Sequence, residues 1–356
     1  MPRVIELSSD IASNPTPAMR KAMAEAEVGD EQSGRDPTVN KLCAMVAELL
    51  GKDDAIYLPS GTMCNQVAYR VHCQPGDEII ADRHAHAVNS ENGAIGALIG
   101  ANVRTVDGLR GIFTGAQVER EIRGPGPTAP RSRLVSVEQT ANRGGGAIWP
   151  LGNLNDVAAV ARRHGLATHM DGARLLNAVV ATQISARNYV RNYDSAWIDL
   201  SKGLGCPVGA VLAGANDFIK QAWRYKRQFG GAMRKAGIIA AAGVYALQHH
   251  VDRLAEDHAN AKRLAVCLAQ ISGVAIRPDE VETNIVSFDV GELNLTAAEF
   301  SGRLLRRGVR VYAPGPTVVR CVTHLDISWD DCDAALREIA AVVAEARHDG
   351  GAAAAT

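Results

Sequence analysis

The 356-residue sequence predicts an α/β fold with a mostly parallel central sheet and a smaller α+β domain at the C-terminal end. Short apolar segments alternate with helical stretches as far as Gly237, which is typical of a parallel sheet covered by helices on both faces. Beyond Gly237 the pattern changes to long helices followed by isolated strand-like segments. We therefore expect a large domain over residues 1–245, whose first 15–25 residues reach the ligand site or the small domain, and a small domain over residues 246–356.

The clearest helix follows Asp36, which can cap it, and Pro37, which suits a first helical turn. Apolar residues then recur on one face until Gly51 closes the helix. In the large domain the strands are expected at 55–58, 78–82, 102–108, 133–140, 166–172, 195–201 and 209–214, and the remaining helices at 63–72, 92–100 and 155–165. In the small domain we expect helices within 236–270 and at 330–347, and strands at 283–290, 310–314 and 320–328.

Composition excludes several classes of partner. The formal net charge of -1 gives no basic face for nucleic acid or an anionic membrane, and 4 % aromatic residues offer little surface for stacking bases. The 7 cysteines are an odd number without metal-ligand spacing, which favours reduced thiols in the cytoplasm. No signal peptide is apparent, and no apolar stretch reaches the ~18–20 residues of a membrane span. We expect a cytoplasmic protein with no metal site.

Ser60, Gly61 and Thr62 lie at an expected strand-to-helix junction. Hydroxyl groups and backbone N–H groups at a helix N-terminus can hold a phosphate. The alternative interpretation is a simple helix cap.

Two further segments end expected strands. Asp171 follows an apolar strand and is itself followed by Arg174, at the edge of the sheet where open α/β folds bind ligands. Alternatively, this aspartate is a helix cap beside a surface arginine. Ser201 and Lys202 end another apolar strand, where a desolvated lysine can form a Schiff base. Alternatively, the lysine extends along the surface towards water.

Together the three segments predict a site for pyridoxal 5'-phosphate. This cofactor needs an anchor for its phosphate, a lysine for its aldehyde and a carboxylate for its pyridine nitrogen. Coincidence of all three at one sheet edge is far less expected than any one alone.

At these residues the sequence resembles the low-specificity threonine aldolases, within the β-eliminating lyase group of fold-type-I pyridoxal-phosphate enzymes. The resemblance covers nearly the whole chain, and its most specific motifs are HMDGAR and SKGLG. Other matching segments are PTPAMRKAMAEAEVGDE, GRDPTVNKLCAMVAELLGK, PSGTMCNQ, NRGGG, GGAMRKAG, LAEDHANAKRLA, ETNIVSFDV and RCVTHLDIS.

The resemblance implies roles for the matching positions. Lys202 would form the Schiff base, Asp171 would pair with the pyridine nitrogen, and His86 would stack on the ring. The remaining implied cofactor contacts are Ser60, Gly61, Thr62, Arg174 and Ser201, together with Arg227 and Arg234 from a neighbouring subunit of a homo-oligomer, a dimer or a homotetramer. The implied substrate contacts are Ser9, Arg174 and Arg320, which would bind the carboxylate, and Ser90 and Ala141.

The sequence departs from the family pattern around the substrate side chain. Ala141 stands in the Thr140–Asn142 segment where the family has a histidine, and Ser90 stands where it often has a tyrosine. Arg35 replaces a glutamate in the Ser-Gly-Arg-Asp-Pro segment. These changes remove two rings, add space and add a cation, so we expect a β-substituent larger or more polar than methyl.

Other titratable residues keep simpler interpretations. His86 taken alone could be a hydrogen-bonded core histidine, and His169 and His324 are expected to be structural. Glu91 and Glu138 stay undecided between bracing a neighbour and facing water.

The predicted function is cleavage of a β-hydroxy-α-amino acid, threonine-like or bulkier, to glycine and an aldehyde. Either His86 or an ordered water would take the β-hydroxyl proton. The alternatives are a β-eliminating lyase with the same cofactor and a non-catalytic homologue.

Overall fold

The computed structural model describes residues 3–124 and 126–353, and side chains as far as residue 349. The chain forms two compact units, one over Pro15–Val251 and the other over Asp252 onward together with the residues up to Asn14. The boundary expected at 245/246 falls inside a helix, α10 (Gly237–His249). The division comes after this helix because its continuous backbone hydrogen bonds hold both of its ends in the same unit. Within the described ranges, no helix is long and apolar enough to cross a bilayer.

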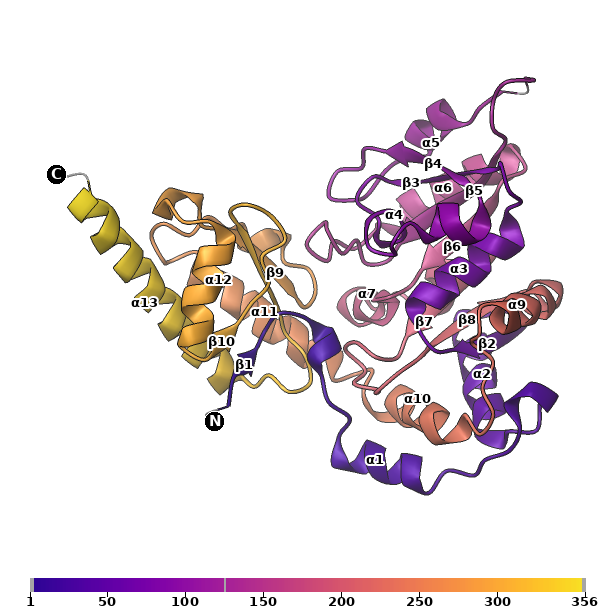
Figure 1. Ribbon diagram of the computed structural model, residues 1–356, viewed down its shortest axis with the longest axis horizontal. Helices are drawn as coiled ribbons and strands as arrows, with labels where there is room; N and C mark the ends of the chain where they lie inside the picture. The colour runs from indigo at the N-terminus through magenta and orange to yellow at the C-terminus, as the bar shows by residue number, and fades with distance from the viewer. Residues whose placement is uncertain (1–2, 125, 354–356) are drawn as a thin grey trace. The chain divides into compact units, whose positions relative to one another are not determined.

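The larger unit contains a seven-stranded sheet with the order β2-β8-β7-β6-β5-β3-β4 (Figure 1). Five strands (β3 to β7) run parallel to one another, and β8 is antiparallel to both of its neighbours. The bounds are β2 (Asp54–Leu58), β3 (Glu78–Asp82), β4 (Asn102–Val106), β5 (Ser132–Glu138), β6 (Ala167–Asp171), β7 (Ser195–Asp199) and β8 (Ala210–Gly214). The mostly parallel sheet predicted from the sequence is confirmed.

Helices surround this sheet, and their ends follow local capping chemistry. The carboxylate of Asp36 accepts from the N–H groups of Thr38 and Val39 at the start of α2, and Gly51 ends that helix in the left-handed region. The helix expected at 92–100 is a short π-helix, and the one expected at 155–165 begins at Leu151. The helices are α1 (Pro17–Ala24), α2 (Pro37–Leu50), α3 (Gly61–His72), α4 (His86–Asn89), the π-helix (Ile95–Ile99), α5 (Gly115–Glu121), α6 (Leu151–Arg163), α7 (Leu175–Thr182), α8 (Ala186–Val190), α9 (Asn216–Gln228) and α10.

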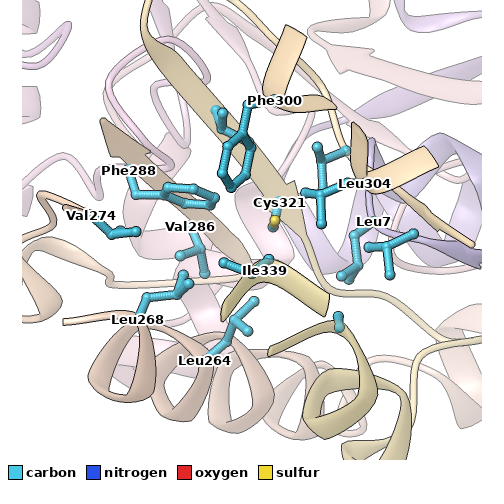
Figure 2. Close-up of a cluster of buried hydrophobic side chains, with 14 of the residues drawn as sticks. Leu7, Leu264, Leu268, Val274, Val286, Phe288, Phe300, Leu304, Cys321 and Ile339 are labelled. Carbon is cyan, nitrogen blue, oxygen red and sulfur yellow. The ribbon is translucent and has the colours of Figure 1, made fainter. Parts of the chain in front are cut away.

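The smaller unit has its own apolar core, shown in Figure 2. Leu7 from the N-terminal segment, Phe288 and Phe300 are buried in it. Its helices are α11 (Leu254–Leu268), α12 (Ala297–Arg306) and α13 (Trp329–Ala353), and its strands are β1 (Ile5–Glu6), β9 (Ile285–Asp289), β10 (Val309–Arg310) and β11 (Val318–Val322). Short 3-10 helices lie at Asp10–Ala12, Pro278–Glu280 and Gly291–Leu293 here, and at Glu31–Ser33 in the larger unit.

The sheets of the smaller unit are small. β9 pairs with β11 in antiparallel fashion, and β1 pairs with β10 in parallel. The strand expected at 310–314 is mostly absent, because β10 ends at Arg310 and only Tyr312 makes an isolated bridge, to Arg320. Alternating apolar residues predicted more strand here than this short pairing supplies.

Candidate active site

Three acidic side chains lie at the ends of neighbouring strands of the larger unit. Glu138 ends β5, Asp171 ends β6 and Asp199 ends β7, and these strands are parallel neighbours. The carboxyl ends of parallel strands meet at one edge of the sheet, which is where α/β folds bind ligands. Lys202 lies three residues after the end of β7. The structure thus brings together the carboxylate and the amine that the sequence predicted at one edge.

The N-terminus of α3 begins at Gly61, after β2, and α3 packs against β7 and β8. Ser60 is its cap, since its Oγ accepts from the N–H of Met63 at 3.1 Å. A Cβ on Gly61 would lie 2.3 Å from the ring of Trp197, so only glycine fits there. The first N–H groups of a helix lack partners within the helix, which leaves Gly61 and Thr62 suited to hold an anion.

Lys202 is held by a residue that the sequence analysis did not single out. Its Nζ lies 3.2 Å from Oδ2 of Asp199, and its side chain is 19 % exposed. The other oxygen of Asp199 accepts from both the N–H and the Oγ–H of Ser201. Lys202 also lies 5.9 Å from the centre of the Trp197 ring. Asp199 therefore orients both Ser201 and Lys202.

A buried amide connects two carboxylates. Nδ2 of Asn65, on α3, donates to Oδ2 of Asp171 and to Oε1 of Glu91, at 2.8 Å in each case. The same oxygen of Glu91 lies 3.0 Å from Nδ1 of His86. Oδ1 of Asp171 accepts from the N–H of Ala173. Asp171, Glu91 and His86 are thus linked through one residue.

The state of His86 follows from this arrangement. The hydrogen bond to Glu91 raises the pKa of His86, and burial opposes that rise. Because a carboxylate accepts hydrogen bonds, the proton of the neutral ring lies on Nδ1, and Nε2 is left as an acceptor. His86 begins α4, and its side chain is 37 % exposed. It is therefore an accessible, oriented imidazole and not an inert core histidine.

Glu138 is nearly buried at the same edge. Burial, followed by the nearby charge of Asp171, raises the pKa of Glu138 to about 7, against partial opposition from backbone hydrogen bonds. Its two oxygens accept from the N–H groups of His86 and Asn142, at 2.9 and 2.7 Å. Glu138 thus braces α4 and the turn that follows β5.

That turn carries Ala141 and contacts Arg174. Nη1 of the buried Arg174 lies 3.2 Å from Oδ1 of Asn142. Ala141 is 4 % exposed, and a Cβ on Gly111 would lie 2.9 Å from its methyl carbon. The space expected beside Ala141 is therefore partly filled by the 108–112 loop.

The remaining predicted residues lie elsewhere on the chain. In the smaller unit, Nη2 of Arg320 on β11 donates to the carbonyl of Ser8, next to Ser9. Arg227 and Arg234 are exposed residues of the larger unit, and Arg234 faces Asp30 at 3.6 Å. Ser90 is exposed at the end of α4.

Two histidines that were expected to be structural are indeed buried and hydrogen-bonded. His169 contacts Ser195 and Asn65, and burial lowers its pKa well below the usual value. Nε2 of His324 lies 2.8 Å from the carbonyl of Glu6 in the smaller unit.

Sequence reasoning missed Asn65, Trp197 and Asp199. Asn65 lies in the quoted PSGTMCNQ segment, one helical turn after Gly61, and this spacing was the available signal. Asp199 precedes Lys202 by three residues in a strand that reads as apolar. Their roles depend on contacts between elements far apart in the sequence.

A family model and curated relatives place this chain in the same family. Residues 6–290 match the family model for β-eliminating lyases. The chain is 41 % identical over 339 residues to the low specificity L-threonine aldolase of Escherichia coli O157:H7, covering 95 % of this chain and 98 % of that protein. The chain belongs to the low-specificity threonine aldolase family of β-eliminating lyases.

Solved structures show the same fold. A threonine aldolase from Leishmania major has a TM-score of 0.81 at 22 % identity, over 95 % of this chain and 99 % of that chain. A high-resolution structure of SPT with PLP has a TM-score of 0.73 at 17 % identity, over 96 % of this chain and 88 % of that chain. The fold is the fold-type-I architecture of pyridoxal-phosphate enzymes, as predicted.

The residues at the sheet edge fit this cofactor. Gly61, whose Cβ position is filled by the Trp197 ring, begins α3, where the first backbone N–H groups lack partners within the helix and can hold a phosphate. The carboxylate of Asp171 is buried and oriented by Asn65 and Ala173. Lys202 supplies the primary amine that an aldehyde needs.

Proposed function

We propose that this protein is a pyridoxal-phosphate-dependent aldolase that cleaves β-hydroxy-α-amino acids to glycine and an aldehyde. The observation that supports this proposal most is that Lys202, Asp171 and the helix N-terminus at Gly61 all lie in the larger unit. In addition, hydrogen bonds link His86 to Asp171 through Asn65. The 41 % identity to a low specificity L-threonine aldolase supports the same reaction.

Several side chains would hold the cofactor. Lys202 would bind its aldehyde carbon, Asp171 its pyridine nitrogen, and Gly61, Thr62 and Ser201 its phosphate. When bound, pyridoxal phosphate supplies an electron sink at the substrate Cα. The exposed Arg227 and Arg234 are proposed to complete the phosphate site of a neighbouring copy in a homo-oligomer, either a dimer or a tetramer.

Arginine side chains would fix the substrate. Arg174 is held at the sheet edge by Asn142, and its guanidinium can bind a carboxylate in bidentate fashion. Ser9 and Arg320, in the smaller unit, are proposed as further substrate contacts, and Arg320 donates to the carbonyl of the neighbouring Ser8. Orientation of this carboxylate determines which bond at Cα breaks.

His86 is proposed as the base for the β-hydroxyl group. Its Nδ1–H is held by Glu91, so Nε2 can accept the hydroxyl proton. The Cα–Cβ bond then breaks, its electron pair stays with Cα, and Cβ leaves as the aldehyde carbon. A proton delivered to Cα completes glycine.

A small pocket beside Glu138 is proposed to receive the β-substituent. Two of the residues that line this pocket also contact the site. Glu138 accepts from the N–H of His86, and Asn142 contacts Arg174. Trp149 lines it, is 1 % exposed, and its Nε1 has no hydrogen-bond partner among the described residues. A substituent with a hydrogen-bond acceptor would satisfy this donor, which supports a substituent larger or more polar than methyl.

The test is product analysis on the purified holoenzyme with threonine, allo-threonine, phenylserine and 3-hydroxyaspartate. We expect equimolar glycine and aldehyde, with faster turnover of the bulkier or polar substrates than of threonine. Keto acid and ammonia as the products would establish β-elimination instead. Threonine turned over as fast as the others would overturn the proposed substrate preference alone.

The compartment is proposed from cysteine chemistry. All seven cysteines are free thiols, which favours the reducing cytoplasm.

A further inference from the structure

Asn65 lies at the centre of a hydrogen-bond network, and the proposed reaction gives this residue no role of its own. It is fully buried on α3. Its side chain has four polar partners, two on the amide nitrogen and two on the amide oxygen. A primary amide has two N–H donors and two acceptor sites, so its hydrogen-bonding capacity is filled.

The orientation of this amide is fixed by Trp197. Nε1 of Trp197 lies 2.8 Å from Oδ1 of Asn65, and an indole nitrogen can only donate. The amide oxygen must therefore face Trp197, which leaves both hydrogens of Nδ2 for Glu91 and Asp171. Trp197 cannot swing away readily, because it is 2 % exposed and its ring lies against Gly61.

The hydrogen bonds that fix the Asn65 amide continue through side chains of the sheet. Nε2 of His169 lies 3.2 Å from Oδ1 of Asn65 and therefore donates to it. Nδ1 of the neutral His169 then accepts from Oγ of Ser195 at 2.8 Å. Oγ of Ser195 in turn accepts from Nε2 of His72, also at 2.8 Å. Burial lowers the pKa of both histidines, to about 4 in His72, so the chain consists of neutral groups.

We propose that Asn65 is a positioning residue that presents Asp171 to the cofactor and Glu91 to His86 at the same time. One amide thus couples the group that would hold the pyridine nitrogen to the base that would take the substrate proton. This inference rests on the proposed function, which assigns the roles of Asp171 and His86, whereas the hydrogen bonds of Asn65 are observed in the chain itself.

The decisive variant is Asn65→Asp, which keeps the shape and replaces both donors by acceptors. It places a third carboxylate against Asp171 and Glu91 and removes the N–H groups that Asn65 donates to both, which adds negative charge near His86. We expect the dissociation constant for pyridoxal phosphate to rise about 10-fold or more, the loss typical of a hydrogen bond to a charged group. We also expect the pKa of His86 to rise, measured by NMR of histidine-labelled, cofactor-free protein.

Two further variants make the test specific. Gln66→Glu adds the same charge one residue further along α3, at a position outside the network, and should leave the dissociation constant within about twofold. Asn65→Ser retains at most one donor and cannot donate to both carboxylates. Its loss of affinity for pyridoxal phosphate should lie between those of the wild type and Asn65→Asp, and it can be measured even if Asn65→Asp fails to fold.

A purely structural role would lower the unfolding temperature of the Asn65 variants without changing cofactor affinity or the pKa of His86, and that result would overturn the inference. If both quantities change as expected but the wild-type holoenzyme forms no glycine, the positioning role stands and the proposed aldolase function fails.

Discussion

The raised pKa of Glu138 makes a quantitative prediction about how stability depends on pH. Its value of about 7 in the folded chain compares with an ordinary value of 4.5. Between these values the folded protein keeps a proton that the unfolded chain has lost, so stability falls as pH rises through this window. At about 1.4 kcal/mol per pH unit over about 2.5 units, the loss amounts to about 3 kcal/mol.

Glu138→Gln removes this titration. We expect the free energy of unfolding of the cofactor-free wild type to fall by about 3 kcal/mol more than that of the variant between pH 4.5 and pH 7.5. Urea denaturation at a series of pH values measures the difference. Glu25→Gln, at a side chain that is 66 % exposed, is the matched control and should follow the wild type. Parallel curves for wild type and Glu138→Gln would refute the reasoning.

Two further predictions concern the linked side chains. Glu91→Gln should lower the pKa of His86, because the Glu91 hydrogen bond is the main cause of its rise. Activity needs neutral His86 and falls as pH falls through that pKa, so the acid limb of the kcat/KM profile should move to lower pH. An unmoved acid limb would contradict the role of His86 as base. Gly61→Ala should cost about 1–3 kcal/mol of stability and weaken cofactor binding, because the new Cβ meets Trp197 at 2.3 Å. Gly152→Ala is the control, because a Cβ there has no atom within 4 Å, and it should change neither stability nor cofactor binding. Thermal-unfolding and binding assays measure both effects.

The fold was largely predictable because alternating strands and helices leave a strong periodic signal. The placement of Asp171 and Lys202 at one edge of the sheet was also predictable, since each lies at or just after the end of an apolar strand and strand ends converge in an α/β sheet. Capping explains why the helix after Asp36 was placed well, with both of its ends marked by sequence. The short β10 was overestimated because alternation alone does not show whether a partner strand continues.

The connections within the site were not predictable from spacing. Asn65 contacts Asp171 across 106 positions and Trp197 across 132 positions of sequence. Only the packing of α3 against the sheet brings them together. The loop that covers Ala141 likewise comes from residues 108–112, so the space beside that alanine could not be judged from the substitution itself.

The most direct test of the account is to locate the covalent attachment of the cofactor. The purified holoenzyme is reduced with borohydride, digested, and its peptides are mapped by mass spectrometry. We predict a pyridoxyl-phosphate group on Lys202 alone, and no trapped cofactor in a Lys202→Ala variant. Attachment at another lysine, or none in the wild type, would contradict the site at the end of β7 on which the proposed reaction depends.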